Sequence, residues 1–131
     1  MTNDLDVLLV EDSAFFRDVI LAYLRPLNLK IEMADNGSNA IEILTRLPIP
    51  RLIICDVHMP DMDGIELTRR LRMLPPPYEP YILMLTSSAD VATVKEAMQA
   101  GANGYVVKLP PREEFVKRIY GILTARPRAT A

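Results

Sequence analysis

Residues 52–56 read Leu-Ile-Ile-Cys-Asp, four apolar side chains in succession followed by a carboxylate. A strand that is buried on both faces is apolar at every position, whereas a strand with one face in solvent alternates between apolar and polar residues. Residues 52–55 are therefore typical of a strand inside a covered parallel sheet. Four further segments have strand character, namely Val7–Val10, Ile31–Met33, Tyr81–Leu85 and Tyr105–Val107.

The segments between these strands repeat their apolar residues three and four positions apart, which is typical of helices with one buried face. Asn36-Gly37 and Asp63-Gly64 precede two of these segments, and Asn and Asp are common helix caps. Parallel strands need crossover connections, which are usually helical. The alternation of strand and helix therefore predicts an open α/β fold in which helices cover both faces of a parallel sheet.

The composition excludes several classes of protein. The 131 residues carry 15 basic and 17 acidic side chains, so no positive field favours binding to nucleic acid. The only cysteine, Cys55, permits no intrachain disulfide, and the apolar runs are far shorter than the roughly 20 residues that cross a bilayer. We expect a cytoplasmic protein without membrane insertion, with one domain over residues 1–125 and a disordered tail or truncated linker over 126–131.

Polar side chains follow the predicted strands where they end. Glu11 and Asp12 follow the first strand, Asp56 the third, Thr86 the fourth and Lys108 the fifth. The carboxyl ends of parallel strands meet at one edge of a sheet, where ligands bind. Adjacent carboxylates repel one another unless a cation neutralises them, and their oxygens suit Mg²⁺, which often also binds phosphate. This edge is therefore predicted to handle phosphoryl groups, with Asp56 as the nucleophile and Lys108 and Thr86 as stabilising groups.

Four sequence motifs occur in combination. They read Val-Glu-Asp-Ser (10–13), Cys-Asp-Val-His-Met-Pro-Asp-Met-Asp-Gly (55–64), Met-Leu-Thr-Ser (84–87) and Ala-Gly-Ala-Asn-Gly-Tyr-Val-Val-Lys (100–108). Over residues 5–124 the sequence resembles the receiver domain of response regulators, the CheY-like module of two-component signalling. The resemblance implies a flavodoxin-like fold, an open five-stranded parallel sheet in the order 2-1-3-4-5 with five helices on its two faces.

The same resemblance implies a phosphoacceptor. Asp56 would take a phosphoryl group from the phosphohistidine of a sensor histidine kinase or of a histidine phosphotransfer protein. Asp12, Asp56 and the backbone carbonyl of His58 would bind Mg²⁺, and Glu11 would act mostly through water. Lys108 would pair with the phosphoryl group. The chain would then catalyse only its own phosphorylation and dephosphorylation, and would not be a conventional enzyme.

A switch to a downstream output protein is also implied. Thr86 would close onto the phosphoryl group while Tyr105 swings inward, which would change the surface that an output protein contacts. Val94 and Lys95 are the candidate contacts on that surface. The alternative is that Tyr105 is a half-buried strand aromatic with no part in switching.

Two aromatic residues begin the first predicted helix, and successive positions of a helix cannot both face the core. Phe16 keeps step with Ile20 and Leu24, so we expect Phe16 to face the core. Phe15 should then be partly exposed beside the acidic edge, as a docking contact for the kinase or phosphotransfer protein. Ordinary partial burial of Phe15 under a loop is the alternative.

The residue after Lys108 departs from the family pattern. Receivers usually have Pro at this position, joined by a cis peptide bond, whereas here Leu109 precedes Pro110. A cis bond before a residue other than proline costs about 3 kcal/mol. We therefore predict a trans Lys108–Leu109 bond, or a shift of the turn to Leu109–Pro110, and this puts the position of the Lys108 amine in doubt.

Three alternative functions stay open. The chain could be the excised receiver of a larger regulator with a DNA-binding or enzymatic output domain. It could be an aspartyl-phosphate hydrolase with a small-molecule substrate, although such enzymes need a second acid where this chain has His58. It could also be a phosphate-independent binding module, if Lys108 lies away from the acidic edge.

Overall fold

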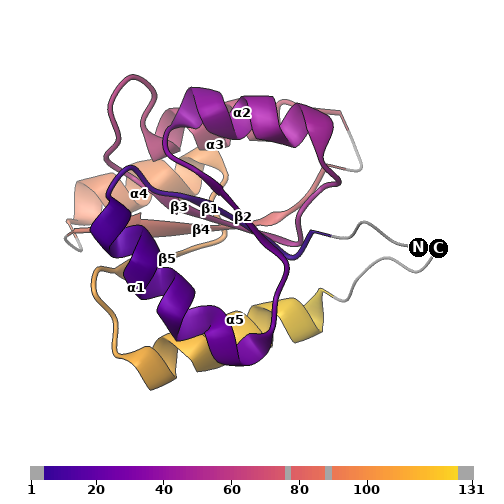
Figure 1. Cartoon of the computed structure of the whole chain (residues 1–131). Coiled ribbons are helices and arrows are strands. Elements are labelled where there is room, and N and C mark those ends of the chain that lie inside the picture. Colours follow the sequence, from indigo (N-terminus) through magenta and orange to yellow (C-terminus); the bar gives the residue numbers. More distant parts are fainter. Residues whose placement is uncertain (1–4, 76–77, 88–89, 127–131) are drawn as a thin grey trace.

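The computed structural model describes residues 5–75, 78–87 and 90–126, and its strands alternate with helices along the whole chain (Figure 1). A short 3-10 helix, Arg25–Leu27, follows the first α-helix. The strands are β1 (Val7–Val10), β2 (Ile31–Ala34), β3 (Leu52–Asp56), β4 (Tyr81–Thr86) and β5 (Gly104–Val107). The helices are α1 (Ala14–Leu24), α2 (Gly37–Arg46), α3 (Gly64–Arg72), α4 (Val91–Ala100) and α5 (Arg112–Ala125).

The strands form one parallel sheet in the order β2-β1-β3-β4-β5, which confirms the predicted flavodoxin-like topology. In this register Val10 at the end of β1 pairs with Ala34 of β2 and with Cys55 of β3. The carboxyl ends of these strands are therefore level with one another. The residues that follow them emerge at the same edge of the sheet.

Helices α2, α3 and α4 cover one face of the sheet, and α1 and α5 cover the other (Figure 1). Successive residues of a strand point to opposite faces, so the apolar runs divide between two cores. On β1, Leu8 packs under α2 and α3, whereas Leu9 packs under α1 and α5. This division explains why the central strands are apolar at every position.

Short polar side chains begin the helices at the edge where the strands end. The Ser13 hydroxyl accepts a hydrogen bond from the backbone N–H of Phe16, and the Asp63 carboxylate accepts one from that of Glu66. Such caps satisfy N–H groups that have no partner within the helix. The caps therefore fix where α1 and α3 begin relative to the ends of β1 and β3.

A buried ion pair joins three elements at the opposite, amino-terminal edge of the sheet. Arg51 Nη2 lies 2.8 Å from Oδ1 of Asp6, whose side chain is fully buried. Arg51 Nη1 also donates to the backbone carbonyls of Leu123, at 2.8 Å, and Arg126, at 2.9 Å. One guanidinium group thus links the approach to β1, the residue before β3 and the end of α5.

Among the described residues, no helix is long and apolar enough to cross a membrane.

Candidate functional site

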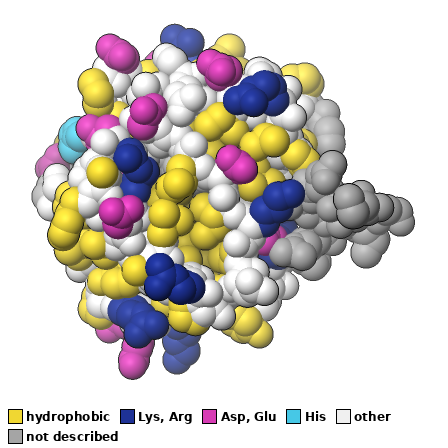
Figure 2. Space-filling model, in the orientation of Figure 1, with side chains coloured by type: hydrophobic (Ala, Val, Ile, Leu, Met, Phe, Trp, Pro, Cys, Tyr) yellow, Lys and Arg dark blue, Asp and Glu magenta, His cyan; other side chains and the backbone are white. Residues whose placement is uncertain are grey.

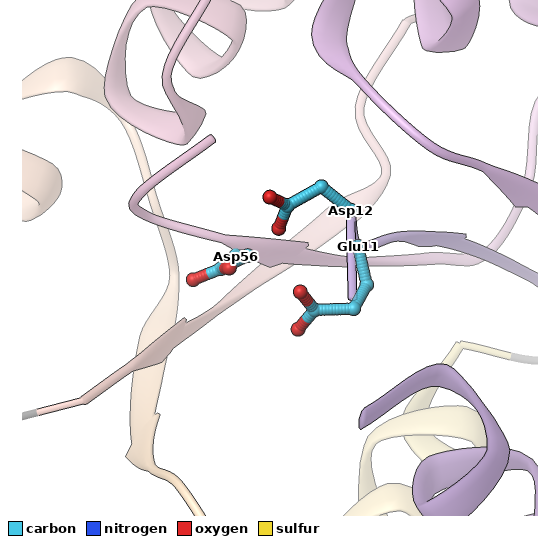
Figure 3. A group of neighbouring side chains, drawn as sticks. All are labelled: Glu11, Asp12 and Asp56. Atoms are coloured by element: carbon cyan, nitrogen blue, oxygen red, sulfur yellow. The ribbon is translucent and has the colours of Figure 1, made fainter. Parts of the chain in front are cut away.

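Three carboxylates meet at the carboxyl edge of the sheet. Glu11 and Asp12 follow β1 and Asp56 ends β3, and Figure 3 shows their carboxyl groups around a common space. One carboxylate oxygen from each residue lies within 4.8 Å of the others. Glu11 and Asp56 are buried, while Asp12 is exposed. Clustered oxygen donors with one solvent-facing member fit a hard divalent ion such as Mg²⁺, which keeps several water ligands.

The amine of Lys108 lies within this cluster. Its Nζ atom is 2.8 Å from Oε1 of Glu11 and 3.0 Å from Oδ2 of Asp56, and its side chain is 11% exposed. The backbone N–H of Lys108 donates to the carbonyl of Thr86 at 2.8 Å, which ties the end of β5 to β4. The structure therefore brings the fifth-strand lysine together with the carboxylates.

The prediction of a trans Lys108–Leu109 bond is wrong, because that bond is cis in the structure. The intrinsic preference of a peptide bond was the only basis for the prediction. Contacts from distant parts of the chain act on the same residue: the carbonyl of Thr86 holds its N–H, and Glu11 and Asp56 hold its amine. The Lys108 amine therefore lies in the site, although Leu109 replaces the usual proline.

Burial and charge shift the ionisation of two groups here. Burial raises the pKa of Glu11 to about 7; the hydrogen bonds from Lys108 and from the Ser13 N–H oppose this rise, and the charge of Asp56 adds to it. For Lys108, burial lowers the pKa, but the bonds to Glu11 and Asp56 outweigh it and hold the pKa above its usual value. The lysine is therefore a cation in the folded chain at neutral pH.

The candidate switch residues Thr86 and Tyr105 lie on the neighbouring strands β4 and β5. Thr86 ends β4 and is buried, whereas Tyr105 on β5 is 39% exposed. A surface cavity of about 430 Å³ lies beside Tyr105, with Val94 and Lys95 of α4 among its lining residues. The candidate switch residue and the candidate output contacts thus share one surface.

His58 and Phe15 lie at the rim of the site. The backbone N–H of His58 donates to Oδ1 of Asp56 at 3.3 Å. His58 itself is exposed, and Figure 2 shows acidic and basic side chains interspersed with apolar ones over this side of the molecule. Phe15 is 64% exposed, which confirms the predicted exposure. Its predicted docking role stays a prediction.

The prediction that Phe16 faces the core is wrong. Among the described residues, the apolar cluster between the sheet and helices α1 and α5 includes Ile20 and Leu24 but not Phe16. The half-buried ring of Phe16 instead lies under the Lys108 amine, with Nζ 4.2 Å from the ring centroid. Helical spacing indicates the side of a helix on which a residue lies. It does not indicate that the first turn of α1 extends beyond the core to the site.

Gly64 is a second residue that the sequence reasoning did not assign to the site. A Cβ atom built on Gly64 would collide with the backbone carbonyl of Asp56 and would lie 2.8 Å from Cε of Met84. Gly64 also donates its N–H to the carbonyl of Val57 at 2.8 Å. The absence of a side chain therefore lets α3 begin against the strand end that carries Asp56. The Asp63-Gly64 pair in the sequence indicates a helix start but not this close approach.

The comparisons with known proteins agree with this geometry. The model of the response regulator receiver domain family matches residues 7–120. The chemotaxis protein CheY of Halobacterium salinarum is 34% identical over 119 residues, which cover 91% of this chain and 97% of that protein. The receiver domain of a sensor histidine kinase from Pseudomonas aeruginosa, solved with magnesium coordinated in its active-site cleft, has a TM-score of 0.79 and 29% identity. That match covers 90% of this chain and 96% of the solved chain.

Longer proteins match as well. The transcriptional regulatory protein ZraR of Escherichia coli is 33% identical over 109 residues, which cover 82% of this chain but 24% of ZraR. The chain thus spans about a quarter of the length of the first curated relatives that it matches.

Proposed function

Because this chain belongs to the response regulator receiver domain family of two-component signalling, we propose that it accepts a phosphoryl group on Asp56. The donor is the phosphohistidine of a sensor histidine kinase or of a histidine phosphotransfer protein. The observation that carries the proposal is the position of the Lys108 amine, which forms ion pairs with both Glu11 and Asp56 within the carboxylate cluster. This position argues against a phosphate-independent module with a displaced lysine.

The proposed cofactor is Mg²⁺, held by Asp12, Asp56 and the backbone carbonyl of His58, with Glu11 acting mostly through water. The all-oxygen cluster supports this choice. The related Pseudomonas domain has magnesium in its active-site cleft. When bound, Mg²⁺ supplies positive charge that offsets the charge of the carboxylates and of the phosphoryl oxygens.

The transfer itself uses the residues of this chain as follows. An oxygen of Asp56 attacks phosphorus, the P–N bond to the donor imidazole breaks, and the imidazole nitrogen keeps the electron pair and takes up a proton. The Lys108 amine moves from the Asp56 carboxylate to a phosphoryl oxygen, and the Thr86 hydroxyl bonds to another. Water later hydrolyses the acyl phosphate. Catalysis is therefore confined to phosphorylation and dephosphorylation of the chain itself.

The proposed output is a change of surface that a downstream protein recognises. Thr86 moves toward the phosphoryl group and Tyr105 turns inward from its exposed position. The cavity beside Val94 and Lys95 then changes shape, because Tyr105 is one of its lining residues. Exposed Phe15 is the proposed contact for the phosphoryl donor. We expect these encounters to take place in the cytoplasm.

A second possibility is that the chain is the receiver of a larger regulator. The match to a quarter of ZraR, a transcriptional regulatory protein, favours this possibility. Helix α5 ends at Ala125, and we propose residues 1–125 as the receiver domain and 126–131 as a tail or linker. Residues 127–131 lie outside the described part of the chain.

The test is incubation with Mg²⁺ and acetyl phosphate, followed by measurement of the intact mass. We expect a gain of one phosphoryl group, which Asp56→Asn and a chelator should each abolish. Asp61→Asn is the matched control, because Asp61 is exposed and belongs to the same loop as the site. A phosphorylated Asp56→Asn chain, or an unmodified wild-type chain with acetyl phosphate and with a phosphorylated histidine donor, would contradict the proposal.

A further inference from the structure

The Lys108 amine has three neighbours of different kinds. Two are carboxylate oxygens, Oε1 of Glu11 at 2.8 Å and Oδ2 of Asp56 at 3.0 Å. The third is the ring of Phe16, whose centroid lies 4.2 Å from Nζ. An ammonium group has three N–H donors and no acceptor. One N–H donates to Oδ2 of Asp56, and the contact with Oε1 of Glu11 is an ion pair, so an N–H remains for the aromatic ring.

We propose that Phe16 is a positioning residue, whose ring holds the Lys108 amine against Glu11 and Asp56 in the orientation that phosphoryl transfer requires. The face of an aromatic ring carries negative charge density and attracts a cation, most strongly where water is excluded. The Lys108 side chain is 11% exposed, so water competes little with the ring. An aliphatic side chain of similar size would fill the space without attracting the amine.

Phe16 is itself fixed relative to the carboxylates. Its backbone N–H donates to Oγ of Ser13 at 3.3 Å, which sets the first turn of α1. Arg17 Nη1 donates to the backbone carbonyl of Glu11 at 2.9 Å, which ties this turn to the end of β1. The ring of Phe15 packs edge-on against that of Phe16, with centroids 5.4 Å apart. Ser13 and Arg17 thus tie the turn that carries the ring to Glu11.

The consequence concerns the step in which Lys108 changes partner. On phosphorylation of Asp56 the amine passes from a carboxylate oxygen to a phosphoryl oxygen, while the ring stays beside it. Phe16 therefore keeps the amine in place when one of its two ionic partners is altered. This inference rests on the proposed function, because the amine has that task only if Asp56 accepts phosphate.

Replacement of Phe16 separates the charge of the ring from its shape. Phe16→Leu removes the ring, Phe16→Tyr keeps an aromatic face, and pentafluorophenylalanine at position 16 keeps the shape of the ring but removes the negative charge of its face. With Mg²⁺ and acetyl phosphate, we expect phosphorylation to be roughly three- to tenfold slower for the leucine and fluorinated chains. The tyrosine chain should react at close to the wild-type rate. Tyr120→Leu, an exposed aromatic change on α5, is the matched control.

A second measurement needs no phosphate. In NMR spectra of the wild-type chain, the Hε protons of Lys108 should be shifted upfield by the ring of Phe16, and Phe16→Leu should remove the shift while Phe16→Tyr retains it. Unshifted wild-type protons, or wild-type phosphorylation rates in both the leucine and fluorinated chains, would overturn the proposal. If Phe16→Leu does not fold, the phosphorylation rate of the fluorinated chain still tests whether the charge of the ring matters. If wild-type Asp56 is never phosphorylated, the proposed function fails while the NMR result still tests the contact.

Discussion

Glu11 is buried beside a cation and a second carboxylate, so its ionisation differs between the folded and the unfolded chain. Because burial raises its pKa to about 7 from 4.5, the folded chain binds a proton at Glu11 more tightly than the unfolded chain does. The free energy of unfolding falls with rising pH wherever the folded state binds more protons. Glu11 therefore makes the metal-free chain less stable as the pH rises from about 4.5 to about 7.

The corresponding prediction compares the wild-type chain with Glu11→Gln in the presence of a chelator. Between pH 5 and pH 7.5 the stability of the wild-type chain relative to Glu11→Gln should fall by about 1–2 kcal/mol. Urea unfolding at the two pH values measures this difference. A difference that stays constant, or that grows in favour of the wild-type chain, would show that Glu11 is ionised throughout this range.

Gly64 is required by the close approach of α3 to the end of β3. Gly64→Ala places a methyl group against the carbonyl of Asp56, so we expect a loss of about 2–3 kcal/mol in unfolding free energy. Gly121→Ala is the matched control, because a Cβ atom at this exposed position of α5 meets no atom within 4 Å. It should stabilise the chain by about 1 kcal/mol. Equal effects of the two changes in urea unfolding would refute the packing argument.

The sequence indicated which residues follow each strand, and therefore which residues meet at the carboxyl edge. Glu11, Asp56 and Lys108 could be predicted because the ends of parallel strands are level. The cis bond after Lys108 and the contact of Phe16 could not be predicted in this way. Both depend on how residues far apart in sequence pack, and neither a peptide-bond preference nor helical spacing contains that information.

At the scale of elements, strands and helices could be predicted almost completely from apolar patterns. Four strands are one residue longer than predicted: β2 ends at Ala34, β3 at Asp56 and β4 at Thr86, and β5 begins at Gly104. The ion pair between Asp6 and Arg51 could not be predicted from the sequence, because neither residue lies in a motif and 45 positions separate them. Charged residues of this kind are usually solvated, so their burial is visible only in the structure.

This ion pair yields a prediction about the joint between β1, β3 and α5. Arg51→Met removes the guanidinium group from the fully buried carboxylate of Asp6 and from the carbonyls of Leu123 and Arg126. We expect a loss of about 3 kcal/mol in unfolding free energy, as for other broken buried ion pairs.

The matched control for this joint is Arg69→Met, because the ion pairs of Arg69 are about half exposed. This change should cost less than about 1 kcal/mol. Urea unfolding of the two variants and of the wild-type chain measures both losses. Similar losses in the two variants would mean that burial adds nothing to the Asp6–Arg51 pair.

At the scale of the whole molecule, the site at the carboxyl edge and the surface around Tyr105 belong to one proposed response. Thr86 connects them, since it follows Leu85, the β4 residue that pairs with Asp56, and its carbonyl accepts the N–H of Lys108. We therefore expect phosphorylation to alter the conformation of β5 and α4 but to leave the opposite edge of the sheet around Arg51 unchanged.

Hydrogen–deuterium exchange with and without acetyl phosphate tests this prediction. We expect the exchange rates in α4 and β5 to change several-fold on phosphorylation of the wild-type chain. Thr86→Ala should still gain the phosphoryl mass but lose most of that change, because the hydroxyl that follows the phosphoryl group is gone. If exchange changes equally in both chains, Thr86 has no part in the coupling.

The Arg51 guanidinium holds both described ends of the chain, since it contacts the side chain of Asp6 and the backbone of Arg126. Residues 6–126 could therefore be inserted into a surface loop of another protein, because two neighbouring attachment points need little extra length from the host loop. In such a graft the carboxylate edge would point away from the host and stay open to solvent. The fold is therefore suitable for protein engineering as an inserted domain whose carboxylate edge stays exposed.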